Sequence, residues 1–104
     1  MYISGGSNVY PREVEEVLLS HPDLSEVAIL GIPDPQWGEV GLAVCVGEPG
    51  AALDETVLAA FLDGKVARYK MPARYLFIPE MPKSAYGKIT KKLVREHLAD
   101  QGLL

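Results

Sequence analysis

Four lysines fall within eleven residues near the end of the chain, in the stretch PKSAYGKITKK from Pro82 to Lys92. Lys88 directly follows Gly87 in a predicted turn, and binding or catalytic side chains are often presented on such loops. Its ammonium is a compact cation that suits phosphate or carboxylate oxygens. This placement makes Lys88 the first candidate for contact with an anionic substrate.

Lys91 and Lys92 raise a separate question, because Thr90 before them is a predicted helix N-cap. Positive charge in the first turn opposes the helix dipole and costs on the order of 0.3 to 1 kcal/mol per lysine. A phosphate bound near the helix start would convert that cost into an attraction. A solvated basic face would also be tolerated, because surface charges are screened by salt. Both interpretations stay open.

The basic residues are concentrated in one part of a chain whose net charge is −4. Residues 1–64 hold eleven acidic side chains and one basic one, whereas residues 65–95 hold nine basic side chains and one acidic one. This asymmetry predicts a local field for an anionic ligand or partner, unless the fold intermixes the two parts. The acidic balance overall argues against nucleic-acid binding.

Several other chemistries lack the residues they need. His21 and His97 belong to no cluster at metal-ligand spacing, so no metal site is predicted. Cys45 lies in an apolar run, where we expect a buried thiol. Neither a Gly-x-Ser-x-Gly elbow nor a P-loop is present, which argues against a hydrolase or a self-sufficient nucleotidase. No apolar run approaches the roughly 20 residues of a membrane span, and no signal peptide is evident, so a cytoplasmic setting is expected.

The elements expected to position these residues form one α+β domain over residues 1–104. A short β-hairpin turns at Gly5-Gly6, and a helix is predicted over 11–21 because proline suits its first position. The predicted architecture is a small, mostly antiparallel three-stranded sheet with three packed helices plus this N-terminal hairpin. The remaining elements are strands at 27–32, 40–46 and 74–78, a helix capped by Asp54 and a last helix capped by Thr90.

Five ordered motifs carry a family resemblance that covers essentially the whole chain. They are SGGSNVYPREVE (4–15), HPD (21–23), GIPDPQWGE (31–39), YKMP (69–72) and PKSAYGK (82–88). With this spacing the chain resembles the small C-terminal domain of the adenylate-forming (AMP-binding) superfamily. The variant SGGxNVYP is most similar to acyl-CoA synthetases that act on fatty or aromatic acids.

The resemblance implies a two-step ATP-dependent acid-thiol ligation. Such enzymes convert a carboxylate and ATP to an acyl-adenylate, with ATP and magnesium held mainly by a large N-terminal domain, and then transfer the acyl group to coenzyme A or a carrier thiol. Lys88 matches the family's adenylation lysine, and Gly87 would keep its loop slim. Lys83 matches a position that is often basic and is either supporting or merely solvated.

A thiolation face for coenzyme A is implied as well. Gly5 and Gly6 would let the pantetheine arm pass close to the backbone, and Trp37 would either pack on that arm or cover the sheet edge. Tyr69 and Lys70 match a segment that in some relatives meets the adenine and phosphate end of coenzyme A, although one relative's arginine in this segment is replaced here by methionine.

The expected partners are the domain's own N-terminal adenylate-binding domain, coenzyme A and the acyl-adenylate, with no nucleic acid and no membrane span. The family's hinge residue precedes the segment that begins this chain. We therefore expect a chain without hinge or large domain, inactive alone, either an excised domain or a separately encoded subunit. The alternative is a non-catalytic module that docks an acidic partner through its basic face. The choice of carboxylic acid, the oligomeric state and any acetylation of Lys88 are not encoded here.

Overall fold

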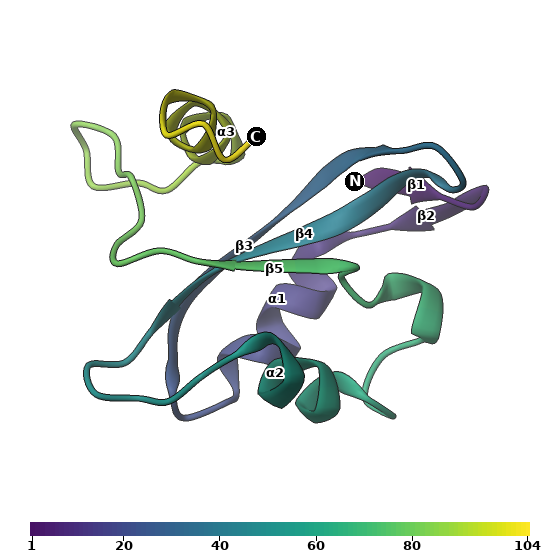
Figure 1. Cartoon of the computed structure of the whole chain (residues 1–104), viewed down its shortest axis with the longest axis horizontal. Coiled ribbons are helices and arrows are strands. Elements are labelled where there is room, and N and C mark those ends of the chain that lie inside the picture. Colours follow the sequence, from purple (N-terminus) through teal and green to yellow (C-terminus); the bar gives the residue numbers. More distant parts are fainter.

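A long antiparallel pair of strands forms the middle of the computed structural model, which describes all residues 1–104 (Figure 1). β3 (Leu24–Asp34) and β4 (Gly38–Gly47) pair along their whole length, with a register shift only after Leu24. Both strands are rich in β-branched residues, which pack well on a pleated surface. They correspond to the predicted strands at 27–32 and 40–46, and each extends further at both ends.

Three shorter strands extend the sheet on the other side of β4. β1 (Tyr2–Ser4) and β2 (Ser7–Val9) form the predicted hairpin, and β1 pairs antiparallel with β4 where Ser4 faces Gly38. β5 (Arg74–Phe77) pairs with β4 in parallel. The sheet order is β2-β1-β4-β3, with β5 also beside β4. The mostly antiparallel α+β fold is confirmed, and the hairpin proves to be part of one five-stranded sheet.

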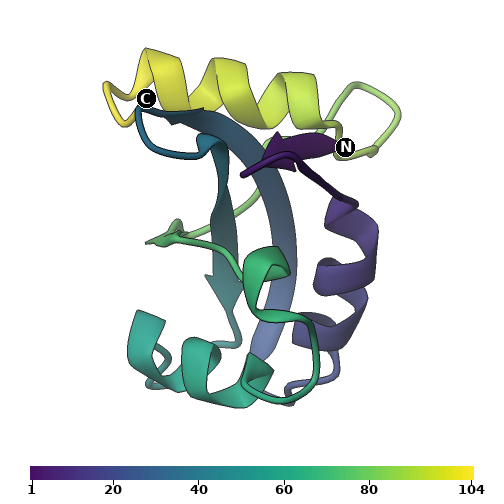
Figure 2. The ribbon, with the colours of Figure 1, turned by 90° about the vertical axis from the view of Figure 1, so that its right-hand side faces the viewer.

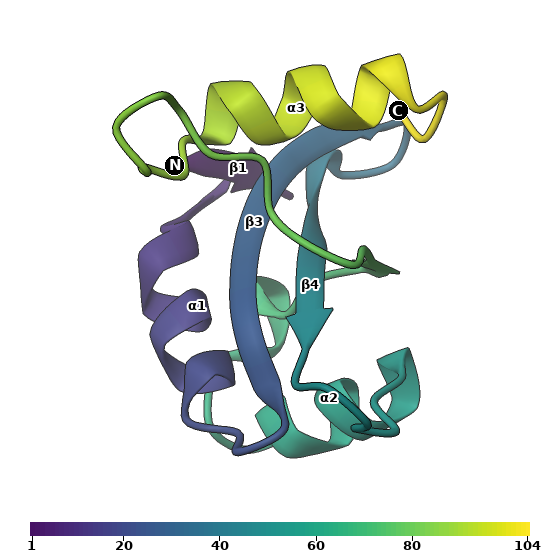
Figure 3. The same cartoon turned by 90° about the vertical axis from the view of Figure 1, so that its left-hand side faces the viewer.

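Helices cover both faces of this sheet (Figures 2 and 3). α1 (Pro11–Leu19) and α2 (Glu55–Leu62) pack on one face, and α3 (Lys91–Asp100) crosses the other. A single 3-10 turn, η1 (Arg68–Lys70), leads into β5. α1 ends two residues before the predicted boundary, because Ser20 caps it by donating its hydroxyl to the carbonyl of Val17.

Both predicted side-chain caps are present. Asp54 Oδ1 accepts a hydrogen bond from the Val57 amide at 2.9 Å, and Thr90 Oγ1 accepts one from the Leu93 amide at 3.2 Å. Each satisfies an amide that would otherwise lack a partner in the first helical turn. The longest helix has 10 residues, and no helix combines the length and apolar character that a membrane crossing requires.

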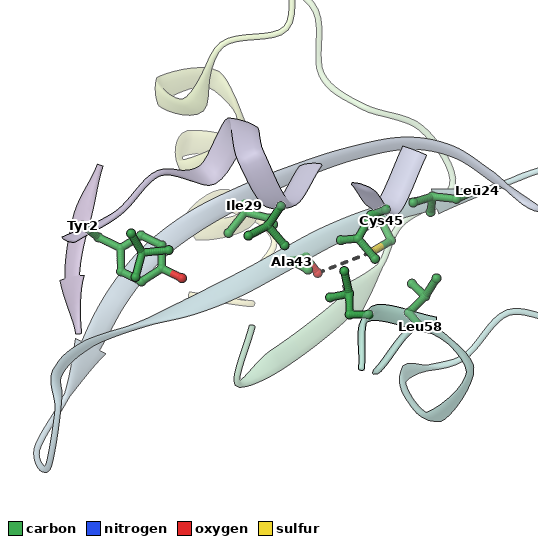
Figure 4. Packing of buried hydrophobic residues seen from close by; sticks show 10 residues of the cluster. Tyr2, Leu24, Ile29, Ala43, Cys45 and Leu58 are labelled. Carbon is green, nitrogen blue, oxygen red and sulfur yellow. Dashed lines mark hydrogen bonds between the residues drawn. The ribbon is translucent and has the colours of Figure 1, made fainter. Parts of the chain in front are cut away.

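The sheet separates two apolar cores, because alternate side chains of a strand point to opposite faces. In β4, Ala43 and Cys45 point toward α1 and α2, whereas Leu42 and Val44 point toward α3. Figure 4 shows the first core, where the Cys45 thiol lies among aliphatic side chains. Burial raises its pKa to about 12, so the thiol stays protonated at neutral pH, as expected for a structural cysteine.

Candidate functional site: two ends of one domain

The loop before α3 closes on itself through Ser84. The Ser84 carbonyl accepts from the Gly87 amide at 2.9 Å, and the Ser84 amide donates to the Lys88 carbonyl at 2.7 Å. Ser84 Oγ also accepts from the amides of Tyr86 and Lys88, at 3.3 and 3.2 Å. Gly87 has a φ of +76°, a conformation that favours glycine. The turn thus fixes the backbone of Lys88 and leaves its side chain exposed.

Lys88 differs from the other lysines of this stretch in having no carboxylate partner within 4.0 Å. Its ammonium is therefore available to an external anion. The other three lysines are each paired with a glutamate of this chain: Lys83 with Glu26 at 3.6 Å, Lys91 with Glu15 in direct contact, and Lys92 with Glu96 at 4.0 Å.

Glu15 explains how a lysine is tolerated at the start of α3. Its Oε2 accepts a hydrogen bond from the Ile29 amide of β3 at 2.8 Å and another from Lys91 Nζ. Burial, and after it the nearby positive charge of Arg95, lower the pKa of Lys91 to about 8. The compensation for Lys91 comes from within the fold, and no phosphate is required. The side chain of Lys92 is 86% exposed, as expected for a lysine on a solvated basic face.

The contrast in charge between residues 1–64 and 65–95 is partly neutralised in the folded chain. Three ion pairs join the two parts, because α1 and β3 lie beside the segments that carry the lysines. They are Lys70 with Glu13, Lys83 with Glu26 and Lys91 with Glu15. Part of the charge asymmetry is therefore used in contacts within the fold.

A pocket of about 470 Å³ lies at the opposite end of the molecule, beside the β1–β2 hairpin and the β3–β4 turn, well away from the Lys88 loop in Figure 1. Three separate stretches of the chain build it. The lining residues are Ser4, Gly5, Ser7, Trp37, Val40, Arg68, Tyr69, Met71 and Ala73. The pocket brings together three predicted thiolation residues, namely Gly5, Trp37 and Tyr69.

Trp37 is held at this pocket by its own turn. Asp34 Oδ2 accepts hydrogen bonds from the amides of Gln36 and Trp37, at 3.0 and 2.9 Å. The Trp37 carbonyl accepts from the Gly5 amide at 2.8 Å. A Cβ at Gly5 would lie 2.8 Å from the Trp37 ring, so the close approach requires glycine, whereas a Cβ at Gly6 would meet nothing within 4 Å. Trp37 is 51% exposed, with a ring that both packs on Gly5 and lines the pocket.

The side chains of the Arg68–Lys70 turn lie in two different places: Lys70 contacts Glu13, whereas Arg68 and Tyr69 line the pocket. Both hydrogen bonds of Lys70 Nζ go to the Glu13 carboxylate, at 2.9 and 3.0 Å, which raises the pKa of Lys70. Lys70 does not line the pocket, whereas Arg68 and Met71 do. In a 3-10 turn, residues three apart lie on the same side. The sequence analysis missed Arg68, and the signal that could have revealed it is this spacing of three from Met71.

Residues 13–88 match the AMP-binding enzyme C-terminal domain. The chain belongs to this family. The match includes Trp37, the Tyr69–Lys70 segment and Lys88, and begins after Gly5 and Gly6. The structure contains no group of three or more histidine, cysteine, aspartate or glutamate side chains that could hold a metal ion.

Similar proteins are much longer ligases. The chain is 46% identical over 99 residues to an indoleacetate–CoA ligase of Aromatoleum aromaticum, with 95% of this chain and 19% of that protein covered. It is 46% identical over 92 residues to a 2-succinylbenzoate–CoA ligase of Geobacillus kaustophilus, with coverage of 88% and 19%. An ATP-bound MatB structure from Rhodopseudomonas palustris aligns with a TM-score of 0.89 and 37% identity, covering 97% and 20%. The chain spans about a fifth of the length of these relatives.

Proposed function

We propose that this domain is the C-terminal catalytic part of an ATP-dependent acyl-CoA synthetase and serves both of its half-reactions. Lys88 acts in adenylation, in which a carboxylate and ATP give an acyl-adenylate and pyrophosphate. The pocket around Gly5 and Trp37 acts in thiolation, in which the thiol of coenzyme A displaces AMP from the acyl-adenylate. A large N-terminal domain would hold the acid and most of the nucleotide, in the cytoplasm.

The observation that carries the adenylation role is the unpaired ammonium of Lys88 on a fixed turn. Adenylation brings a carboxylate against the α-phosphate of ATP, and the two anions repel each other. A preorganised cation between them lowers that barrier, more so where water is excluded. Lys83 and Lys91 are already paired with Glu26 and Glu15, so they are less suited to this work.

The position of the two sites supports a domain that changes its orientation. The Lys88 turn and the pocket lie toward opposite ends of a molecule whose longest extent is 35 Å (Figure 1). One placement against a large domain cannot bring both of them to the same acyl group. We infer that the domain turns between the half-reactions, presenting Lys88 first and the pocket second.

The alternative of a purely electrostatic docking module has less support. It requires several free lysines on one face, and three of the four lysines in 82–92 are paired with glutamates of this chain. Ion pairs of this kind leave little net attraction for an acidic partner beyond the single charge of Lys88.

The test uses a two-domain enzyme that carries this domain, with Lys88→Ala compared with Lys83→Ala. Removing one charged contact to a developing transition state typically costs about a hundredfold or more in rate. We expect such a loss for Lys88→Ala in acyl-adenylate formation, followed by pyrophosphate release. Thiolation of a supplied acyl-adenylate should be nearly unchanged, and Lys83→Ala should affect neither step by more than a few-fold.

Two results would overturn the proposal. One is equal damage to both half-reactions by Lys88→Ala in a folded enzyme. The other is an equal loss in the Lys83 and Lys88 variants, which would favour the docking module.

A further inference from the structure

We propose that Glu15 is a positioning residue for adenylation, which keeps Lys88 in its working place through Lys91 and the start of α3. The inference rests on the proposed function, because it concerns the lysine of that reaction. Glu15 lies on α1, far from Lys88 in the sequence, and acts on it only through other groups of this chain.

The hydrogen bonds that shape the Lys88 turn all lie within the turn, between Ser84 and the residues just after it. Tyr86 at its tip is 91% exposed. On the entry side the chain is held by Met81, which is buried in the core beneath α3. The turn therefore keeps its own shape, but its place on the domain depends on the segments that precede and follow it.

The segment that follows the turn is the start of α3, which is only partly covered. Ile89 and Thr90 alone separate Lys88 from Lys91, the first residue of the helix. Val94 is the first fully buried residue of α3. Helix ends fray when little holds them. A polar contact at Lys91 is therefore well placed to keep the start of α3, and with it the turn, in one position.

Glu15 provides that contact from the body of the domain. Its Oε2 accepts a hydrogen bond from the Ile29 amide at 2.8 Å and is in direct contact with Lys91 Nζ. Ile29 is 1% exposed and pairs with Ala43 in the middle of the sheet. Hydrogen bonds to a charged acceptor are stronger than neutral ones. The Glu15 side chain is 16% exposed, so water competes little with either contact.

Lys92, the next residue, has a partner of another kind. It pairs at 4.0 Å with Glu96, which lies on the same helix and has a 56% exposed side chain. Exposed ion pairs contribute little to stability, and a pair within α3 cannot hold α3 to another element. Two adjacent lysines of one helical turn thus differ in whether their partner belongs to the body of the domain.

Arg95 makes a second contact on the same edge of the sheet. One turn after Lys91, it donates a hydrogen bond to the Gly31 carbonyl at 2.7 Å. Gly31 follows Ile29 by two residues, and β3 is the last strand at this side of the sheet. Figure 3 shows the loop end of α3 above α1, beside β3. Contacts on two successive turns of α3 hold both the place and the direction of its first half.

The test compares Lys91→Gln with Lys92→Gln in the two-domain enzyme, because both make the same change at adjacent exposed positions. For Lys91→Gln and for Glu15→Gln we expect the kcat of acyl-adenylate formation to fall about 5- to 10-fold, in the range of one charge-assisted contact. The KM values for ATP and the acid should change by less than about twofold, because a displaced Lys88 affects the transition state more than ground-state binding. Lys92→Gln should match the parent enzyme, and Lys91→Arg, which can keep the contact with Glu15, should retain most of the rate.

Glu15→Gln separates positioning from a simple effect of charge. This variant removes the negative charge beside Lys91 and leaves the ammonium in place. If Lys91 acted through its positive field, losing its partner would speed adenylation or lower the KM for ATP, whereas positioning requires a slower reaction. The double variant Glu15→Gln/Lys91→Gln should be no slower than the slower single variant, because both changes remove one contact. Thiolation of a supplied acyl-adenylate should stay at the parent rate in all variants, which also verifies folding.

Three results would overturn the positioning role of Glu15. They are adenylation by Glu15→Gln at the parent rate or faster, equal losses in Lys91→Gln and Lys92→Gln, and a loss of thiolation as large as the loss of adenylation. The proposed function fails separately, if Lys88→Ala leaves adenylation intact. If Lys88→Ala abolishes adenylation while Glu15→Gln leaves it unchanged, only the role of Glu15 is refuted.

Discussion

The Lys88 turn and the Trp37 pocket are built in opposite ways. Five consecutive residues form the turn, and its hydrogen bonds run between Ser84 and the residues just after it. The pocket is assembled from residues 4–7, 37–40 and 68–73, which meet only in the folded sheet. The Lys88 turn therefore needs little of the fold to keep its shape. The pocket depends on the correct packing of β1, β4 and the η1 turn against one another.

This difference predicts separate failure of the two half-reactions. A change in the turn should alter adenylation alone, and a change in the packing of Trp37 should alter thiolation alone. The variants below test that separation in a two-domain enzyme, beginning with the largest expected effect.

Gly5→Ala should produce the largest loss on the pocket side. The new Cβ would lie 2.8 Å from the Trp37 ring, so either the ring or the β1–β2 turn must shift. A displacement of about 1 Å can cost about 100-fold in rate, and we expect a loss of that order in thiolation with adenylation kept.

Gly6→Ala is the matched control for Gly5→Ala. Both glycines have positive φ, +57° and +84°, but the added methyl at Gly6 meets nothing within 4 Å. It should carry only the backbone strain, about 1 kcal/mol of stability. Similar thiolation losses in the two variants would contradict a role for the close contact between Gly5 and Trp37.

Lys88→Arg asks whether charge alone is enough on the turn side. The guanidinium keeps the charge but is larger and planar, and it distributes its donors differently. We expect adenylation to slow by at least about tenfold, measured by pyrophosphate release, with thiolation unaffected. Full activity would mean that the turn provides only a positive field.

Ser84→Ala should have a smaller effect on the same step. It removes the hydroxyl that accepts from the Tyr86 and Lys88 amides, so the turn loses two of its four internal hydrogen bonds. A reduction of about three- to fivefold in adenylation is expected, equivalent to about 1 kcal/mol. Ser84→Thr, which keeps the hydroxyl, should restore the rate if Ser84 acts by positioning Lys88.

Tyr75→Phe should leave both half-reactions intact and change stability instead. The Tyr75 hydroxyl is buried without a hydrogen-bond partner, and removing it should raise the free energy of unfolding by up to about 1 kcal/mol. Urea denaturation at neutral pH measures this change, and a destabilised variant would show that the hydroxyl is satisfied in solution.

The same residue predicts a loss of stability at alkaline pH. Burial raises the pKa of Tyr75 from 10.0 to about 12, so the unfolded chain loses this proton before the folded one does. The contribution of the protonated Tyr75 hydroxyl to the free energy of unfolding is therefore complete below pH 10, and it is lost as the pH rises toward 12. Cys45, raised from 9.0 to about 12, adds to the same trend from pH 9. Tyr75→Phe should reduce the slope of unfolding free energy between pH 10 and 12.

Features set by neighbouring residues could be predicted from the sequence. The caps at Asp54 and Thr90, the helix that begins at Pro11 and the exposed position of Lys88 depend on residues within one or two turns. Local hydrogen bonding and backbone preference decide them, so a single sequence is sufficient.

Features set by distant residues could not be predicted in the same way. The contact between Lys91 and Glu15 joins residues 76 apart, and the parallel pairing of β5 with β4 depends on where the chain returns. Lys70 contacts Glu13 while Arg68 lines the pocket, and this division follows from the 3-10 turn that they share, which no strong local signal marks. Tertiary packing decides such details, and for that reason the sequence indicates Gly5, Trp37 and Tyr69 only through the family resemblance.

The contacts of Glu15 connect the segment that carries Lys88 to the body of the domain. Glu15 fastens the start of α3 to both α1 and β3, and Lys88 is only three residues from that fastening at Lys91. A tether of three residues reaches at most about 10 Å. If the domain turns between half-reactions, Lys88 moves together with the rest of the domain and not on a flexible segment. The Glu15 carboxylate on α1 would then determine how closely the position of the Lys88 ammonium follows a rotation of the domain.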